Sequence, residues 1–335
     1  MRRTSACSFL GILFAFLLCQ VASAVIVAGD YANTSDANVN TSPPADDPGF
    51  YNVGAVGTAS AIYLGTDSQG DGWVLSAAHV TLGNTTFNFP DRANPNQIDS
   101  ATYSIVPNSG VILTNPTGPG AGHNSDLILY KIDPASSPLG LPNLPRLDIA
   151  SSAPSVGATV VGIGRGVDRY SSITYWDSNW NTTTPQNASY SGYALFPTNS
   201  THTMRWGDNA VSQTNVIANV GPTTPVYVSS FLTQFDQNGT PNEFQATTGD
   251  SGGGVFEKVG GQWYLSGMID AVTPAASNQI ANVAVFDTAT VIADLSVYGS
   301  QIRAVVPEPG SLALVGAGLA AWVLSVSFRR YRRAD

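Results

Sequence analysis

Short apolar runs separated by polar, turn-rich stretches dominate the chain after about residue 50. The runs that predict strands lie at 59–65, 73–76, 127–132, 158–164, 255–258, 262–268 and 283–286. Segment 67–72, between the first two runs, is rich in turn-forming residues and predicts a β-hairpin. Gly260 and Gly261 predict a second, tight hairpin between two later runs.

Helical periodicity is convincing in one segment of the body. Apolar residues recur at helical spacing between about 289 and 303, at Val291, Leu295, Tyr298 and Ile302. Many short strands with one late helix indicate an all-β protein, either a sandwich or a pair of barrels. The stretch 167–220 is polar and weakly patterned, so we expect it to form a large surface excursion.

The N-terminal end has the pattern of an export signal. Arg2 and Arg3 precede an apolar run at 9–18, and residues 22–24 (ASA) form a small-residue cleavage site. This order predicts a signal peptide over residues 1–24, removed after its last residue. An uncleaved anchor helix is the alternative, and the short apolar run argues against it.

The C-terminal end has the pattern of a membrane span. Residues 311–328 carry no charge and are followed by a cluster of arginines. As a helix this run is about 27 Å long, close to the thickness of the hydrocarbon core of a bilayer. The arginines belong on the cytoplasmic side, so we expect a single transmembrane helix over 311–328 with the body outside.

A short motif precedes this span. Pro307, Glu308 and Pro309, followed by one apolar span and an arginine-rich end, resemble the bacterial PEP-CTERM sorting signal over residues 305–335. The resemblance implies recognition by an exosortase, cleavage near the motif, and release or attachment at the cell envelope. A plain single-pass anchor is the alternative. Either way, we expect an exported protein outside the cytoplasmic membrane that meets the membrane through its C-terminal segment.

Charge and cysteine usage narrow the function classes. Both cysteines, Cys7 and Cys19, lie in the predicted signal peptide, so the mature body has no disulfides and depends on its core. Between Val25 and Val306 eight Lys and Arg face twenty-one Asp and Glu, a net charge of −13. This balance argues against nucleic acid as a partner. No spacing indicates a metal or cofactor site, so we expect none.

Residues 249–253 (GDSGG) are the most informative stretch of the chain. A serine is a poor nucleophile unless a base takes its proton. It also needs backbone N–H groups aimed at the developing oxyanion, and glycines let the chain turn tightly enough to present them. The pattern predicts Ser251 as nucleophile, with the N–H groups of Gly249 and Ser251 as the oxyanion donors.

Two further segments supply partners for such a serine. Residues 73–79 (WVLSAAH) run from a strand through two alanines into His79, and the small residues would let the imidazole approach a nucleophile. Asp126 stands directly before the apolar strand 127–132. A carboxylate shielded there can accept the Nδ1–H of a histidine and fix its tautomer.

The order His79, Asp126, Ser251 resembles that of the trypsin-like (chymotrypsin-fold) serine proteases. The resemblance implies a protease domain over 25–304, with two six-stranded antiparallel β-barrels at about 50–150 and 155–290 and a closing C-terminal helix. It implies a serine endopeptidase acting on peptide or protein substrates, without a cofactor. A catalytically inactive binding module or a structural surface protein on the same fold is the alternative.

The same resemblance indicates a specificity pocket and an activation device. The pocket floor would be Gln245, whose neutral amide predicts weak selectivity for basic residues, with walls from Asp270, Val272 and Ala284. Val272 could narrow the slot, and Asp270 could instead restore a basic preference. The start of the mature chain, at Val25 and Ile26, resembles the family's mature end. There a freed α-amino group pairs with the Asp before the nucleophile, here Asp250.

Overall fold

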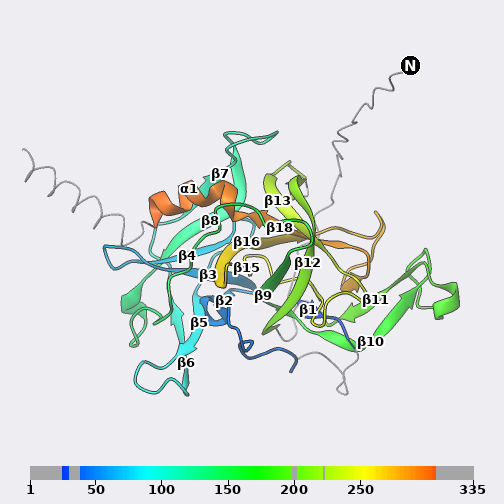
Figure 1. Ribbon diagram of the computed structural model, residues 1–335, viewed down its shortest axis with the longest axis horizontal. Coiled ribbons are helices and arrows are strands. Elements are labelled where there is room, and N and C mark those ends of the chain that lie inside the picture. The colour runs from blue at the N-terminus through cyan, green and yellow to red at the C-terminus, as the bar shows by residue number, and fades with distance from the viewer. Residues whose placement is uncertain (1–24, 30–37, 198–201, 222, 307–335) are drawn as a thin grey trace, which may run out of the picture.

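The computed structural model describes residues 25–29, 38–197, 202–221 and 223–306 (Figure 1). The predicted signal peptide, the motif at Pro307, Glu308 and Pro309, and the span 311–328 lie outside these residues. Within the described ranges, no helix has the length and apolar character needed to cross a membrane.

The first half of the body forms an antiparallel sheet of seven strands in the order β6-β5-β2-β3-β4-β8-β7. The strands are β2 (Val53–Val56), β3 (Ala59–Thr66), β4 (Gly72–Ala77), β5 (Thr85–Pro90), β6 (Ile98–Tyr103), β7 (Val111–Thr114) and β8 (Asn124–Ile132). The expected hairpin joins β3 to β4. Asp67 stabilises its turn, since its carboxylate accepts the backbone N–H groups of Gln69 and Asp71 and the indole N–H of Trp73.

The second half forms a closed barrel in the order β12-β13-β18-β16-β15-β9. The strands are β9 (Thr159–Val167), β12 (His202–Asn219), β13 (Tyr227–Gln234), β15 (Gly254–Val259), β16 (Gln262–Val272) and β18 (Ala289–Asp294). The hairpin predicted at Gly260 and Gly261 joins β15 to β16. Both glycines have positive φ, 60° and 88°, which is the backbone conformation that this turn requires.

The expectation of an all-β, antiparallel fold with one C-terminal helix is confirmed, but the expectation of two six-stranded barrels holds only for the second half. The first half has seven strands and stays open among the described residues. Its edge strands β6 and β7 do not pair, and beyond β6 one isolated bridge, between Ile105 and Ile132, reaches β8 in place of a ladder.

The stretch 167–220 is only partly the surface excursion that its polarity predicted. Its second part is β12, an 18-residue strand of the barrel. Its first part holds β10 (Arg169–Trp176) and β11 (Tyr190–Leu195), which form a separate three-stranded sheet with β17 (Val283–Val285) and project to one side of the barrel (Figure 1). Three short 3-10 turns, at Phe50–Asn52, Pro134–Ser136 and Pro185–Asn187, complete the connections.

The helix α1 (Leu295–Val305) begins six residues later than its periodicity suggested, because residues 289–294 continue as β18. Asp294 caps its first turn by accepting the N–H of Ser296. The hydroxyl of Tyr298 accepts the N–H of Ser229 in the barrel at 3.0 Å and donates to Asn115 beside the seven-stranded sheet at 2.6 Å. The helix therefore links the two halves of the body.

The two halves also share one hydrophobic core. A single cluster of buried side chains includes Leu75 and Leu127 from the seven-stranded sheet and Ile163 and Leu265 from the barrel. Burial of this shared surface holds the ends of β4 and β8 against the loop between β14 (Phe244–Gln245) and β15.

Candidate active site

His79 and Asp126 are brought together by the pairing of β4 with β8. Ala77 lies opposite Leu127, and the N–H of Ala78 donates to the carbonyl of Asp126 at 2.9 Å. The end of this ladder therefore places Asp126 beside His79. The N–H of His79 donates to Oδ1 of Asp126 at 2.8 Å, and the His79 Nδ1 atom is hydrogen-bonded to Oδ2 of the same carboxylate.

Ser251 comes from the other half of the molecule. It lies in the turn between β14 and β15, and its side chain approaches the imidazole edge that does not face Asp126. The Oγ atom lies 2.9 Å from the Nε2 atom of His79. Asp126, His79 and Ser251 therefore form one continuous line of hydrogen bonds across the two halves.

Two glycines make the close approach of the Ser251 turn possible. Gly249 has a φ of 106°, and a Cβ atom there would lie 2.6 Å from the carbonyl oxygen of Thr58. Gly252 has a φ of 88°, and a Cβ atom there would lie 2.2 Å from the carbonyl oxygen of Ser60. Any other residue at either position would push the turn away from β3.

Burial differs along this line of residues. The side chain of His79 is 27% exposed, whereas that of Asp126 is 7% exposed, and Ser251 as a whole residue is 1% exposed. A carboxylate shielded from water interacts more strongly with the imidazole than one on the surface. The imidazole itself remains accessible to solvent.

Asp270 is a fourth member of the site that sequence reasoning placed elsewhere. We expected it in the wall of the pocket, but its carboxylate lies fully buried, with Oδ1 4.0 Å from the Nδ1 atom of His79. Burial raises the pKa of Asp270 well above its ordinary value, and the adjacent charge of Asp126 raises it further. The signal in the sequence was an acidic residue inside an otherwise apolar strand.

Within the part of the chain that the structure describes, the same three side chains lie close enough together to hold a metal ion. Donor atoms of His79, Asp126 and Asp270 lie within 4.8 Å of one another. The hydrogen bond between His79 and Asp126 uses one of the donor atoms on each side chain.

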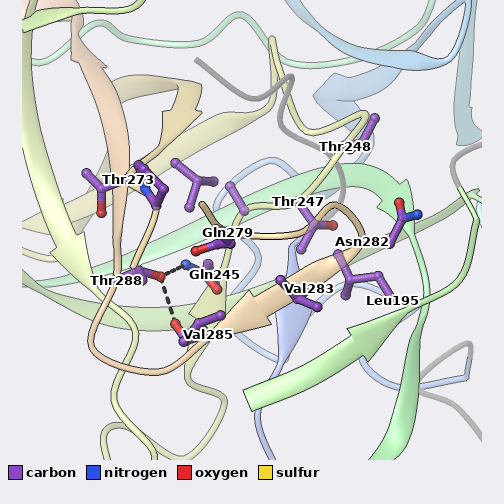
Figure 2. Close-up of a pocket in the computed structure, with 13 residues that line it drawn as sticks. Leu195, Gln245, Thr247, Thr248, Thr273, Gln279, Asn282, Val283, Val285 and Thr288 are labelled. Carbon is purple, nitrogen blue, oxygen red and sulfur yellow. Dashed lines mark hydrogen bonds between the residues drawn. The ribbon is translucent and has the colours of Figure 1, made fainter. Parts of the chain in front are cut away.

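A small cavity lies beside the Ser251 turn (Figure 2). Its volume is about 50 Å³, and none of the described side chains that line it is charged. The polar ones are Gln245, Thr247, Thr248, Thr273, Gln279, Asn282 and Thr288. Gln245 donates from Nε2 to the hydroxyl of Thr288, which in turn donates to the carbonyl of Val285 at 2.7 Å. The Oε1 atom of Gln245 is buried without a hydrogen-bond partner among the described residues.

The expected pocket residues are divided by the structure. Gln245 and Val272 line the cavity, whereas Asp270 and Ala284 do not. Side chains alternate between the two faces of a strand. Val283 and Val285 therefore face the cavity, while Ala284 faces a different cluster that includes Ile26 and Tyr193.

Residues 25–29 pack against the barrel and form a small sheet of their own with one barrel-side segment. β1 (Ile26–Val27) pairs with β14, which places Ile26 opposite Gln245. Two buried arginines bind the carbonyl groups of this segment. Arg205 donates to Val25 at 3.1 Å, and Arg169 donates to Val27 at 2.8 Å and to Gly29 at 2.6 Å. Asp250, the predicted partner of the α-amino group, is fully buried, and its carboxylate accepts the N–H of Thr247 at 2.9 Å.

Sequence reasoning missed Ser60, which braces the Ser251 turn. Its hydroxyl donates to the carbonyl of Gly249 at 2.6 Å and accepts the N–H of Arg165 at 2.9 Å. Its own N–H donates to the carbonyl of Ser251 at 3.0 Å. Nothing in the local sequence around a serine in an apolar strand marks such a contact.

Comparisons with known proteins add information mainly about the tail. Residues 305–333 match the family model of the PEP-CTERM protein-sorting motif. A comparison with curated proteins found no match. Among solved structures, the chain is similar to neuropsin, a serine protease expressed in the limbic system of mouse brain. The TM-score is 0.42 and the identity is 15%, over 80% of this chain and 97% of the neuropsin chain.

The match at the tail confirms the resemblance to the PEP-CTERM signal. The motif implies that the protein is exported to the cell surface and that an exosortase processes its tail.

Proposed function

We propose that the body of this chain is a serine endopeptidase that hydrolyses peptide bonds through an acyl-enzyme. The observation that carries the proposal is the line of hydrogen bonds from Asp126 through His79 to Ser251. A buried carboxylate, a partly exposed imidazole and a hydroxyl 2.9 Å from that imidazole are the parts that this chemistry requires.

In the proposed mechanism, the Oγ atom of Ser251 attacks the carbonyl carbon of the scissile bond while its proton passes to Nε2 of His79. Asp126 holds the imidazole through Nδ1–H and stabilises the imidazolium that forms. The N–H groups of Gly249 and Ser251 bind the oxyanion of the tetrahedral intermediate. His79 then gives the proton to the leaving amine. In the second half of the reaction, His79 takes a proton from a water molecule that attacks the acyl-enzyme. His79 then returns this proton to Oγ of Ser251, and the carboxylic acid product leaves.

The small cavity is the proposed binding site for the side chain on the acyl side of the scissile bond. Its uncharged lining supports a preference for neutral side chains over arginine or lysine. Gln245 at the cavity has a buried oxygen without a partner, and a substrate N–H or O–H group would satisfy it. The volume of about 50 Å³ favours a small side chain.

We also propose that export and activation are one event. Signal-peptide removal after residue 24 would free the α-amino group of Val25. This group would then pair with the carboxylate of Asp250. Ile26 is the nearest match to the first residue of the mature family members. The burial of Val25 and Ile26 in the barrel supports a structural role for this segment. The mature body would then be held at the membrane by residues 311–328 until the tail is cleaved.

The alternatives are an inactive binding module and a structural surface protein. A fluorophosphonate probe separates them from an enzyme, because it labels only an activated serine. We expect labelling of the purified body, its loss in Ser251→Ala, and its retention in Ser212→Ala, which changes an exposed serine on β12. A well-folded wild-type body that is not labelled would contradict the proposed function.

A further inference from the structure

Asp270 occupies an irregular position in the barrel. It lies on β16, which pairs with β18, and the register shifts between Ile269 and Ala271. Such a bulge changes the direction of a side chain relative to its neighbours. The carboxylate of Asp270 is fully buried, although an acidic side chain is almost never buried unless it is paired.

Among the described residues, no lysine or arginine lies beside this carboxylate to neutralise it. Asp126 approaches from β8, and His79 approaches from the end of β4, with Nδ1 4.0 Å away. Tyr298 on α1 is the third titratable group, and its own charged neighbours are Asp270 and Asp294, the residue that caps that helix. Tyr298 gives its proton to Asn115, so it offers none to Asp270.

The hydrogen bonds are distributed unequally between the two carboxylates. Asp126 accepts the N–H of His79 at 2.8 Å and is also bonded to Nδ1 of the same residue. Neither oxygen of Asp270 has a donor among the described residues. Two buried carboxylates side by side cannot both be ionised, and donors stabilise the ionised form. The negative charge therefore belongs on Asp126 and the proton on Asp270.

We propose that Asp270 is a neutral carboxylic acid that donates its O–H to Asp126 and so positions that carboxylate behind His79. The proposal rests on the proposed function, because it gives Asp270 a role in orienting the imidazole. Asp270 touches no reacting atom and is a positioning residue. Its raised pKa, caused first by burial and then by the charge of Asp126, agrees with this assignment.

The proposed proton gives Asp126 a third donor without adding charge. Together the two acids carry one negative charge at rest, which lies on Asp126. During the reaction this charge pairs with the imidazolium of His79. An ionised Asp270 would place a second negative charge beside His79. A cation bound by His79, Asp126 and Asp270 would also need Asp270 ionised, so the protonation state decides between these possibilities.

Infrared spectroscopy tests the proton directly and needs no turnover. We expect the folded wild-type body at pH 7 to show the carbonyl stretch of a protonated carboxylic acid, absent in Asp270→Asn. The matched control is Asp294→Asn, which changes another buried acid near Tyr298 and should retain the Asp270 band. The proposal is overturned if the wild-type spectrum is unchanged by Asp270→Asn. This result is independent of whether the protein hydrolyses peptides.

Kinetics test the positioning role. Asparagine has the same shape and keeps a donor, so Asp270→Asn should retain kcat within about threefold. Asp270→Ala loses the donor and should lower kcat by about 10- to 100-fold with KM nearly unchanged. If Asp270→Ala folds and its kcat equals that of wild type, the positioning role is wrong.

The acid limb of the kcat/KM profile separates a neutral Asp270 from an ionised one. If Asp270 is neutral, Asp270→Asn replaces an uncharged acid with an uncharged amide. The acid limb of the kcat/KM profile should then shift by less than about 0.3 pH unit. Removing a negative charge 4.0 Å from the imidazole would instead shift it down by about one unit or more. A shift of that size would overturn the proposal, whereas failure of the probe to label Ser251 would contradict only the proposed function.

Discussion

The hydroxyl of Ser60 on β3 donates a hydrogen bond of 2.6 Å to the carbonyl of Gly249, two residues before Ser251. The two residues are 189 positions apart and belong to different halves of the body. The same hydroxyl accepts the N–H of Arg165 on β9. One fully buried side chain therefore fixes the Ser251 turn to both the sheet and the barrel.

Replacing Ser60 by alanine should weaken both the fold and the site. The substitution leaves the carbonyl of Gly249 and the N–H of Arg165 buried without their partner, which costs about 1–3 kcal/mol of unfolding free energy. We expect a lower midpoint of urea unfolding and a lower kcat. Ser212→Ala, at an exposed position, should change the unfolding free energy by less than about 0.5 kcal/mol. Equal stability of the two variants would contradict the bracing role.

Asp126→Asn should nearly abolish catalysis without unfolding the protein. The amide can occupy the same space but holds the imidazole in the wrong tautomer, which in a triad lowers kcat by about 10⁴-fold. Peptide hydrolysis measured against wild type, with circular dichroism as a check of the fold, provides the test. A loss below tenfold would show that the carboxylate does not orient His79.

Gln245→Asp should change the substrate preference of the cavity. A buried carboxylate beside the side chain on the acyl side favours a positively charged partner, because an unpaired buried charge is costly. We expect kcat/KM for arginine and lysine substrates to rise by at least about tenfold relative to neutral substrates of the same length, while the small cavity keeps its preference for short side chains. A peptide library that varies this side chain measures the effect. Gln213→Asp, on the exposed surface of β12, is the control.

Extending the mature N-terminus should reduce activity if a free amine at Val25 activates the protein. Two added residues move the charge away from the buried start of the chain while leaving β1 intact. The activity of the extended body is compared with that of a body beginning at Val25, using the same peptide. Unchanged activity would rule out activation by the amine. It would leave the packing of Val25–Val27 as purely structural.

The buried acid at 270 should make the fold less stable as the pH rises. A folded pKa above the unfolded value means that the native state holds a proton that the unfolded chain has released. Above about pH 4 the unfolding free energy should therefore fall by about 1.4 kcal/mol per pH unit until the folded pKa is reached. Urea unfolding from pH 5 to 8 should show this decline in wild type relative to Asp270→Asn. Parallel pH dependences would contradict it.

The sequence predicted those features that depend on local pattern. Apolar runs with turn-forming residues between them indicated the β3–β4 and β15–β16 hairpins, and the structure contains both. The residues that predict the triad are also found together, since strand pairing and a glycine-rich turn position His79, Asp126 and Ser251.

Features that depend on register and closure could not be read in this way. Periodicity at 289–303 does not separate a strand end from a helix start, so Val291 was counted with the helix although it lies on β18. The positions of Asp270 and Ala284 away from the cavity have a similar cause. A bulge at Asp270 and the alternation around Ala284 each turn a side chain to another face, and neither is marked in the sequence.

The groups of the proposed triad come from two parts of the body, the seven-stranded sheet and the barrel, so hydrolysis depends on how these two parts are aligned. The β4–β8 ladder beside residues 79 and 126 and the β15–β16 ladder that follows the turn at residue 251 can each persist while the two parts shift by about an ångström. Proton transfer over 2.9 Å would not survive such a slip. During mild heating or low urea, loss of hydrolysis should thus precede any change in β-sheet circular dichroism.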